Sequence, residues 1–176
     1  MQLCEQHKYQ ENERVIHEFV KKHQPKTIVE LGYGSGALTV AMSYASKEYN
    51  GLIFSYDIIS PDLTINRLIE RNLYDFCTIT QGNVYKTYLV DPIPFDMILI
   101  DIDNTWQLIF DIVINNEFIN KQIRQGSKII IEGGADPHPR INKTTLENFH
   151  NTLGRKVFEF THISGPRTSL SILNLL

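Results

Sequence analysis

Residues 28–37, "IVELGYGSGA", decide the fold of this 176-residue chain. A short apolar run leads directly into three alternating glycines, Gly32, Gly34 and Gly36. Glycine adopts positive φ and lets the backbone approach a ligand closely, so such a loop after a strand is typical of nucleotide-type ligand sites. Two loops fit the spacing. The pattern G-x-G-x-x-A suits a dinucleotide, and E-x-G-x-G-x-G, which includes Glu30, suits a different nucleotide-like ligand.

Strand-like and helix-like segments alternate along the chain, and two strand-like segments follow each other at its end. Alternation predicts a parallel sheet covered by helices, whereas the final turn, "SGPR", is too short for a crossover and requires an antiparallel pair. We therefore expect a doubly wound, Rossmann-like α/β sheet of about seven strands, mostly parallel, with one antiparallel strand near its edge. The expected strands are 27–31, 51–57, one within 75–82, 95–102, one within 126–134, 155–163 and 168–176, and the expected helices are 9–23, 36–49, 61–74, 105–123 and 142–153.

Length and composition predict a single domain over 1–176, with an N-terminal helix within 1–24 and a catalytic core over 25–176. The formal net charge of −3 argues against a broad nucleic-acid surface. No apolar run approaches the ~18–20 residues that span a bilayer, and the polar N-terminus does not read as a secretory signal, so we expect a cytoplasmic protein. Cys4 and Cys77 lie too far apart in sequence to indicate a disulfide framework or a metal-ligand pair.

Polar residues stand where the predicted strands end, which is where ligands bind in sheets of this kind. The first strand leads from Glu30 into the glycine loop, and the second ends in Asp57. An acid at the end of the second strand commonly accepts hydrogen bonds from ribose hydroxyls. Asn83 follows the third strand, where its side chain would reach a base edge or form a turn. The loop and Asp57 together therefore predict a nucleoside-containing ligand.

Glu30 discriminates between the two readings of the loop. A carboxylate just before the first glycine would repel a pyrophosphate and attract a cationic group. S-adenosylmethionine (SAM) carries an ammonium and a sulfonium and no phosphate, and a close charge pair is worth on the order of several kcal/mol at an effective dielectric constant near 20. Charge matching therefore favours SAM over NAD.

The chain resembles the class I SAM-dependent methyltransferases over roughly residues 25–176. The segment "FDMILIDIDNTWQLIFDI" is similar, more narrowly, to a subgroup that carries F-D-x-I-x-I-D-G-D-H-x-Y before a helix and includes O-methyltransferases of sugars and other small hydroxylated molecules. Three positions depart from these patterns: Ile102 replaces Gly, Asn104 replaces His and Asn83 replaces a common Asp. The resemblance is carried by "IVELGYGSG", Asp57, "QGNVY", "FDMILID", "GSKIIIEG" and the closing strand pair.

The resemblance implies a cofactor site along the strand ends. Glu30 and the loop would hold the methionine end of SAM, and Asp57 would hold the ribose. Ile58 would pack on the adenine, whose edge Asn83 would meet. The residues expected to bind the cofactor are Glu30, Gly32, Tyr33, Gly34, Ser35, Gly36, Asp57, Ile58, Asn83, Val84 and Asp101.

Acidic residues at the ends of the fourth and fifth strands suggest the catalytic chemistry. Asp101 and Glu132 would form a carboxylate pair suited to Mg²⁺ or Ca²⁺, which would lower the pKa of a bound hydroxyl. The resembling enzymes usually place another ligand directly after the fifth-strand acid, where this chain has Gly133. Asp101 and His138, in a proline-containing loop, are candidate catalytic groups, and His138 has the reference pKa of a general base near neutrality.

The sequence thus predicts a SAM-dependent methyltransferase acting on a hydroxyl of a small or saccharide-like acceptor. An NAD-dependent oxidoreductase with the same core and a non-catalytic methyltransferase-like binding protein are the alternatives. No long insertion interrupts the sheet, so we expect either an open acceptor site or closure by a second subunit in a homodimer.

Overall fold

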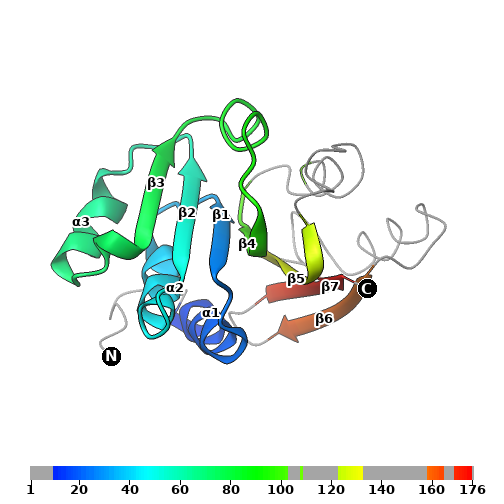
Figure 1. Cartoon of the computed structure of the whole chain (residues 1–176). Coiled ribbons are helices and arrows are strands. Elements are labelled where there is room, and N and C mark those ends of the chain that lie inside the picture. The colour runs from blue at the N-terminus through cyan, green and yellow to red at the C-terminus, as the bar shows by residue number, and fades with distance from the viewer. Residues whose placement is uncertain (1–9, 103–107, 109–122, 133–157, 165–168, 176) are drawn as a thin grey trace.

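A computed structural model describes residues 10–102, 108, 123–132, 158–164 and 169–175. They form one seven-stranded sheet with the order β3-β2-β1-β4-β5-β7-β6 (Figure 1). Apolar residues fill the central strands, as is expected where both faces of a parallel sheet are covered. The strands are β1 (Thr27–Leu31), β2 (Leu52–Asp57), β3 (Cys77–Gln81), β4 (Phe95–Ile100), β5 (Ile123–Glu132), β6 (Phe158–Ser164) and β7 (Ser169–Leu175).

The direction of the strands confirms the predicted sheet. β1 pairs in parallel with both β2 and β4, and β4 pairs in parallel with β5. β7 is antiparallel to β5 on one side and to β6 on the other, so the antiparallel strand lies one place from the edge. The common dinucleotide-binding order is 3-2-1-4-5-6. Insertion of β7 between β5 and β6 therefore distinguishes this sheet from that of a typical NAD-binding domain.

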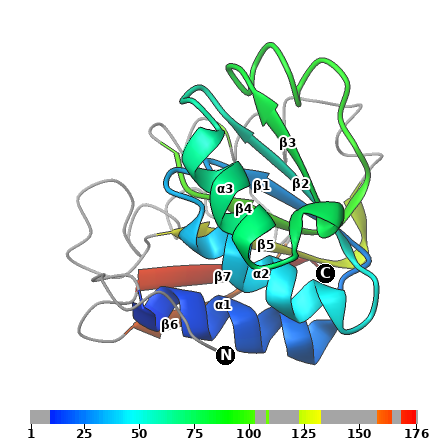
Figure 2. The ribbon, with the colours of Figure 1, turned by 90° about the vertical axis from the view of Figure 1, so that its left-hand side faces the viewer.

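Helices α1 (Gln10–His23), α2 (Ala37–Lys47) and α3 (Asp62–Glu70) lie over one face of the sheet (Figure 2). Their apolar side chains pack on that face in one cluster, which includes Ile16 and Met42. A second cluster, which includes Tyr88 and Phe95, fills the opposite face. No helix among the described residues is long and apolar enough to cross a membrane.

Among the described residues, two boundaries differ from those predicted by more than two residues, and each has a local cause. The helix predicted over 61–74 ends at Glu70, because Asn72 adopts a left-handed φ of 55° and a short 3₁₀ turn, Tyr74–Phe76, follows. The fifth strand begins at Ile123, which the sequence pattern assigned to a helix. The register against β4 shifts near this start, and Gly126 has a φ of 87°, so the alternation typical of a strand is interrupted there. The helix predicted over 142–153 lies outside the described residues. Of the helix predicted over 105–123, only Leu108 and Ile123 are described.

Candidate functional site

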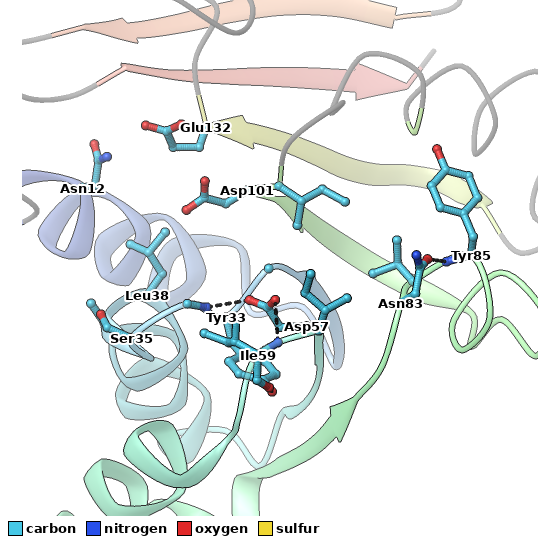
Figure 3. A pocket seen from close by; sticks show the side chains of 16 residues that line it. Asn12, Tyr33, Ser35, Leu38, Asp57, Ile59, Asn83, Tyr85, Asp101 and Glu132 are labelled. Atoms are coloured by element: carbon cyan, nitrogen blue, oxygen red, sulfur yellow. Dashed lines mark hydrogen bonds between the residues drawn. The ribbon is translucent and has the colours of Figure 1, made fainter.

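A cavity of about 660 Å³ lies beyond the carboxyl ends of β1, β2, β4 and β5. The glycine loop after β1 and the residues that follow β2 and β3 line one part of it, and the first turn of α1 and the ends of β4 and β5 line another (Figure 3). The position agrees with the rule that ligands bind outside the carboxyl ends of the strands in open α/β sheets. Most of the residues predicted to bind a cofactor line it: Gly32, Tyr33, Gly34, Ser35, Asp57, Ile58, Asn83, Val84 and Asp101.

The glycine loop is shaped by its close approach to β4. Gly32 has a φ of 97°, and its amide donates to the carbonyl of Tyr56 at 2.7 Å. A Cβ at this position would collide with the carbonyl oxygen of Asp101 and with the side chain of Ile102. Gly34 also has a positive φ, 48°, but a Cβ there would meet nothing within 4 Å. Gly32 is therefore required by packing and backbone conformation together, and Gly34 by backbone conformation alone.

Asp57 ties the glycine loop to the end of β2. Its Oδ2 accepts a hydrogen bond from the amide of Gly34 at 2.9 Å, and its Oδ1 accepts a longer one from the amide of Ile59 at 3.4 Å. The hydroxyl of Tyr33 donates to the carbonyl of Ile59 at 2.6 Å, which closes this part of the rim. A carboxylate offers about four lone-pair positions. Asp57 therefore retains the capacity to accept hydrogen bonds from a ligand in the cavity.

Asn83 begins a turn at the β3 side of the cavity. Its Oδ1 accepts a hydrogen bond from the amide of Tyr85 at 2.9 Å, and its carbonyl accepts one from the hydroxyl of Thr87 at 3.1 Å. These are the bonds of a local Asx-type turn. Val84 is buried beside it, and Ile58, which follows β2 and also lines the cavity, is 66% exposed. Asn83 can thus form the turn and also contact a base edge, because its side-chain amide nitrogen, Nδ2, takes no part in the hydrogen bonds of the turn.

Glu30 lies in a different environment from the one its predicted role suggested. Its side chain is fully buried, it is not among the residues that line the cavity, and one oxygen, Oε2, accepts hydrogen bonds from Thr39 at 2.7 Å and from Ser55. Its Oε1 has no hydrogen-bond partner among the described residues. Burial raises the pKa of Glu30 to about 8, against the smaller opposing effect of the two hydroxyls. Glu30 is therefore mostly neutral at pH 7 in this structure. The prediction that its charge attracts the cationic groups of SAM requires that the bound cation ionise it.

Asp101 and Glu132 both line the cavity, at the ends of adjacent strands β4 and β5 (Figure 3). Within the described part of the chain, no group of three or more His, Cys, Asp or Glu side chains could hold a metal ion. Two carboxylates fit Mg²⁺ only in a site where water and a ligand supply the remaining oxygen atoms. His138, the candidate general base, and Gly133, which stands where the resembling enzymes have a further ligand, lie outside the described residues.

Asn12, on the first turn of α1, lines the cavity and was not predicted to do so. It is 2% exposed, and its Oδ1 has no hydrogen-bond partner within the described structure. The sequence held a signal for it, because Asn12 stands one helical turn before Ile16 and two turns before Val20 on the buried stripe of α1. A polar residue on the buried face of a helix, where Glu13 and His17 are also buried, indicates either a buried polar network or a ligand site.

No protein-family model and no curated protein matches the sequence. Solved structures do share its fold. The O-methyltransferase TomG from Streptomyces achromogenes, in complex with SAM, has a TM-score of 0.70 at 17% identity over 94% of this chain and 79% of that chain. An O-methyltransferase from Bacillus cereus, in complex with S-adenosylhomocysteine (SAH), has a TM-score of 0.68 at 16% identity over 93% of this chain and 80% of that one. The SAH-bound methyltransferase PaMTH1 from Podospora anserina has a TM-score of 0.68 at 14% identity over 94% and 78%.

The chain therefore has the fold of the SAM-dependent methyltransferases, as its sequence pattern predicted. This similarity shows the fold alone. Proteins that share a fold can differ in function, because function depends on the residues of the site.

Proposed function

We propose that this protein is a SAM-dependent methyltransferase that methylates a hydroxyl of a small or saccharide-like acceptor. The observation that carries the proposal is the convergence of the glycine loop, Asp57 and Asn83 on one cavity at the carboxyl ends of β1, β2 and β3. The position of β7 between β5 and β6 supports a methyltransferase over an NAD-dependent oxidoreductase. Neighbours of the same fold whose structures hold SAM or SAH give further support.

The cavity offers separate surroundings to the two halves of SAM. The Asp57 carboxylate would accept hydrogen bonds from the ribose hydroxyls, and the exposed side chain of Ile58 would pack on the adenine. The amide of Asn83 would meet the edge of that base. A ligand held in this way extends its methionine half past Gly32 toward Asp101, where the loop approaches β4 most closely. The methyl group would then lie near the ends of β4 and β5.

SAM supplies a methyl group that is already activated for displacement. The acceptor oxygen forms the new bond to carbon as the carbon–sulfur bond breaks, and the sulfonium becomes a neutral thioether. The protein has to align the acceptor and remove the hydroxyl proton. We assign the proton-accepting role to Asp101 or His138, of which the described structure includes Asp101, on the cavity wall.

We further propose that Asp101 and Glu132 hold Mg²⁺ or Ca²⁺ beside the acceptor hydroxyl. The support is that both carboxylates face one cavity from adjacent strands. A metal bound there would favour the ionised form of the hydroxyl and orient it. Treatment with EDTA is expected to reduce turnover to SAH, and Mg²⁺ is expected to restore it. Turnover that is unchanged by EDTA would contradict the metal while leaving the methyltransferase assignment intact.

Calorimetric titration with SAH and with NAD tests the main proposal. We expect the protein to bind SAH and not NAD, and we expect Asp57→Ala to weaken SAH binding by about 10- to 100-fold, because hydrogen bonds to a charged group contribute about 1.5–3 kcal/mol. Asp75→Ala, an exposed acid in the 3₁₀ turn, is the matched control and should bind like the wild type. Binding of NAD but not SAH would overturn the proposal. Formation of SAH from SAM with a hydroxylated acceptor would exclude a non-catalytic binding protein.

A further inference from the structure

The end of the cavity farthest from Asn83 and Tyr85 has a polar group that the proposed binding of adenosine does not use. Asn12 projects from α1 toward Asp101 and Glu132 at this end (Figure 3). Its side chain is 2% exposed, and its Oδ1 lacks a hydrogen-bond partner in the described structure. Leaving a buried acceptor unpaired costs about 1–3 kcal/mol. A ligand that donates to this atom would remove that cost.

The surroundings of Asn12 differ in charge on its two sides. Asp101 and Glu132 favour a positively charged group, or a group with several N–H donors, on one side. The N-terminus of α2, where Ala37 and Leu38 line the cavity, lies on the other side. The first turn of α2 contains no acidic residue, and its N-cap, Gly36, supplies no side-chain cap. Its amide groups therefore favour an anion.

We infer that Asn12 is a specificity-determining residue that binds the α-amino acid end of the methionine half of the cofactor. An amide side chain carries an acceptor and a donor on one planar group. Oδ1 accepts from the ammonium, and Nδ2 donates to the carboxylate, which the α2 amides also attract. The inference rests on the proposed function, because it assumes that the cavity binds SAM, and it adds a contact from outside the sheet and the glycine loop.

The test compares two ligands that differ only in this end. SAH carries the amino acid group, whereas 5′-methylthioadenosine has the same adenosine and thioether without it. We expect Asn12→Leu, which keeps the size of the side chain and removes its polar atoms, to weaken SAH binding by about 10- to 100-fold in calorimetric titration. Its affinity for 5′-methylthioadenosine should stay within about twofold of the wild-type value. Arg14→Ala, at an exposed position of the same helix, is the matched control and should leave both affinities unchanged.

The melting temperature of the unliganded protein provides a second readout. Because Oδ1 of Asn12 is unpaired in the described part of the folded chain, we expect Asn12→Leu to leave the melting temperature unchanged or to raise it. Asn12→Ala should give the same pattern of affinities if the leucine does not fit. Equal weakening of both ligands, or SAH binding that survives both substitutions, would overturn the inference. A wild-type protein that binds 5′-methylthioadenosine as tightly as SAH would also overturn it, whereas failure to bind either ligand would overturn the proposed function itself.

Discussion

Two of the acids that the sequence placed beside the cofactor, Glu30 and Asp57, stand on neighbouring strands in different surroundings. Glu30, on β1, is fully buried between β2 and α2, and hydroxyl groups donate to it. Asp57, at the end of β2, is partly exposed in the cavity, where backbone amides donate to it. Glu30 is therefore a protonated group within the fold, whereas Asp57 lines the cavity. Acidic residues one strand apart thus lie in different surroundings, and burial favours the neutral form of Glu30.

The largest effect is expected in the glycine loop, which follows the strand of Glu30 and donates a hydrogen bond to Asp57. Gly32→Ala should destabilise the protein by about 3 kcal/mol or more, because a Cβ at a φ of 97° would also collide with the backbone of Asp101. Gly34→Ala should cost only about 1 kcal/mol, because its Cβ would enter open space. Urea unfolding of both variants measures the difference. Equal costs would mean that the approach of the loop to β4 is looser than the structure indicates.

A smaller effect is expected from the titration of Glu30. Its pKa is about 8 in the folded protein, against an ordinary value of 4.5, so between these pH values the folded state holds a proton that the unfolded state has lost. Its contribution to the free energy of unfolding is therefore fully present below pH 4.5 and is lost as the pH rises to about 8. Glu30→Gln removes this dependence. The variant should gain about 2–3 kcal/mol relative to the wild type between about pH 6 and pH 8.5, since each pKa unit is worth about 1.4 kcal/mol.

Urea unfolding at the two pH values measures this gain. Glu70→Gln, an exposed glutamate at the end of α3, is the control and should track the wild type at both. A constant difference between Glu30→Gln and the wild type would show that Glu30 is already ionised at the lower pH.

The smallest effect is expected from Ser55→Ala, which removes one donor from Oε2 of Glu30. That hydrogen bond favours the ionised form and lowers the pKa. Its loss should therefore cost about 1 kcal/mol more at about pH 8.5 than at about pH 6. Ser127→Ala is a matched control, because Ser127 is also buried and donates to the carbonyl of Phe95, on β4, at 3.0 Å. A cost of Ser55→Ala that is independent of pH, like that of the control, would contradict the prediction.

The elements nearest the glycine loop could be predicted from the sequence almost to the residue. The sequence predicts the first strand at 27–31, and β1 is found at Thr27–Leu31, because a short β-branched run bounded by a proline and a glycine leaves little choice. Asp57 lies on the cavity for a similar reason, since the strand that carries it ends where its apolar pattern ends, and its contact with a ribose stays a prediction. Strong local patterns therefore predicted the sheet and the strand-end residues that line the cavity.

The environment of Glu30 could not be predicted in the same way. Its position before the glycines was visible in the sequence, but its burial depends on Thr39 and Ser55, which reach it from α2 and from the neighbouring strand. Asn12 poses the same difficulty, because its place on the cavity depends on how α1 docks against the sheet. The roles of His138 and of the residues after Glu132 stay predictions, because those residues lie outside the described structure.

The position of β7 also has a consequence for how the chain is made. β7 is the last of the described strands to leave the ribosome, yet its place is between β5 and β6. Until it emerges, β5 has β4 as its only partner in the described sheet, and the buried apolar residues Ile129, Ile130 and Ile131 stand along an open edge. An open apolar edge is a template for pairing with other chains. Synthesis that stops before residue 169 is therefore expected to yield an aggregating product, and the sheet closes only when translation has delivered the strand that fills this gap.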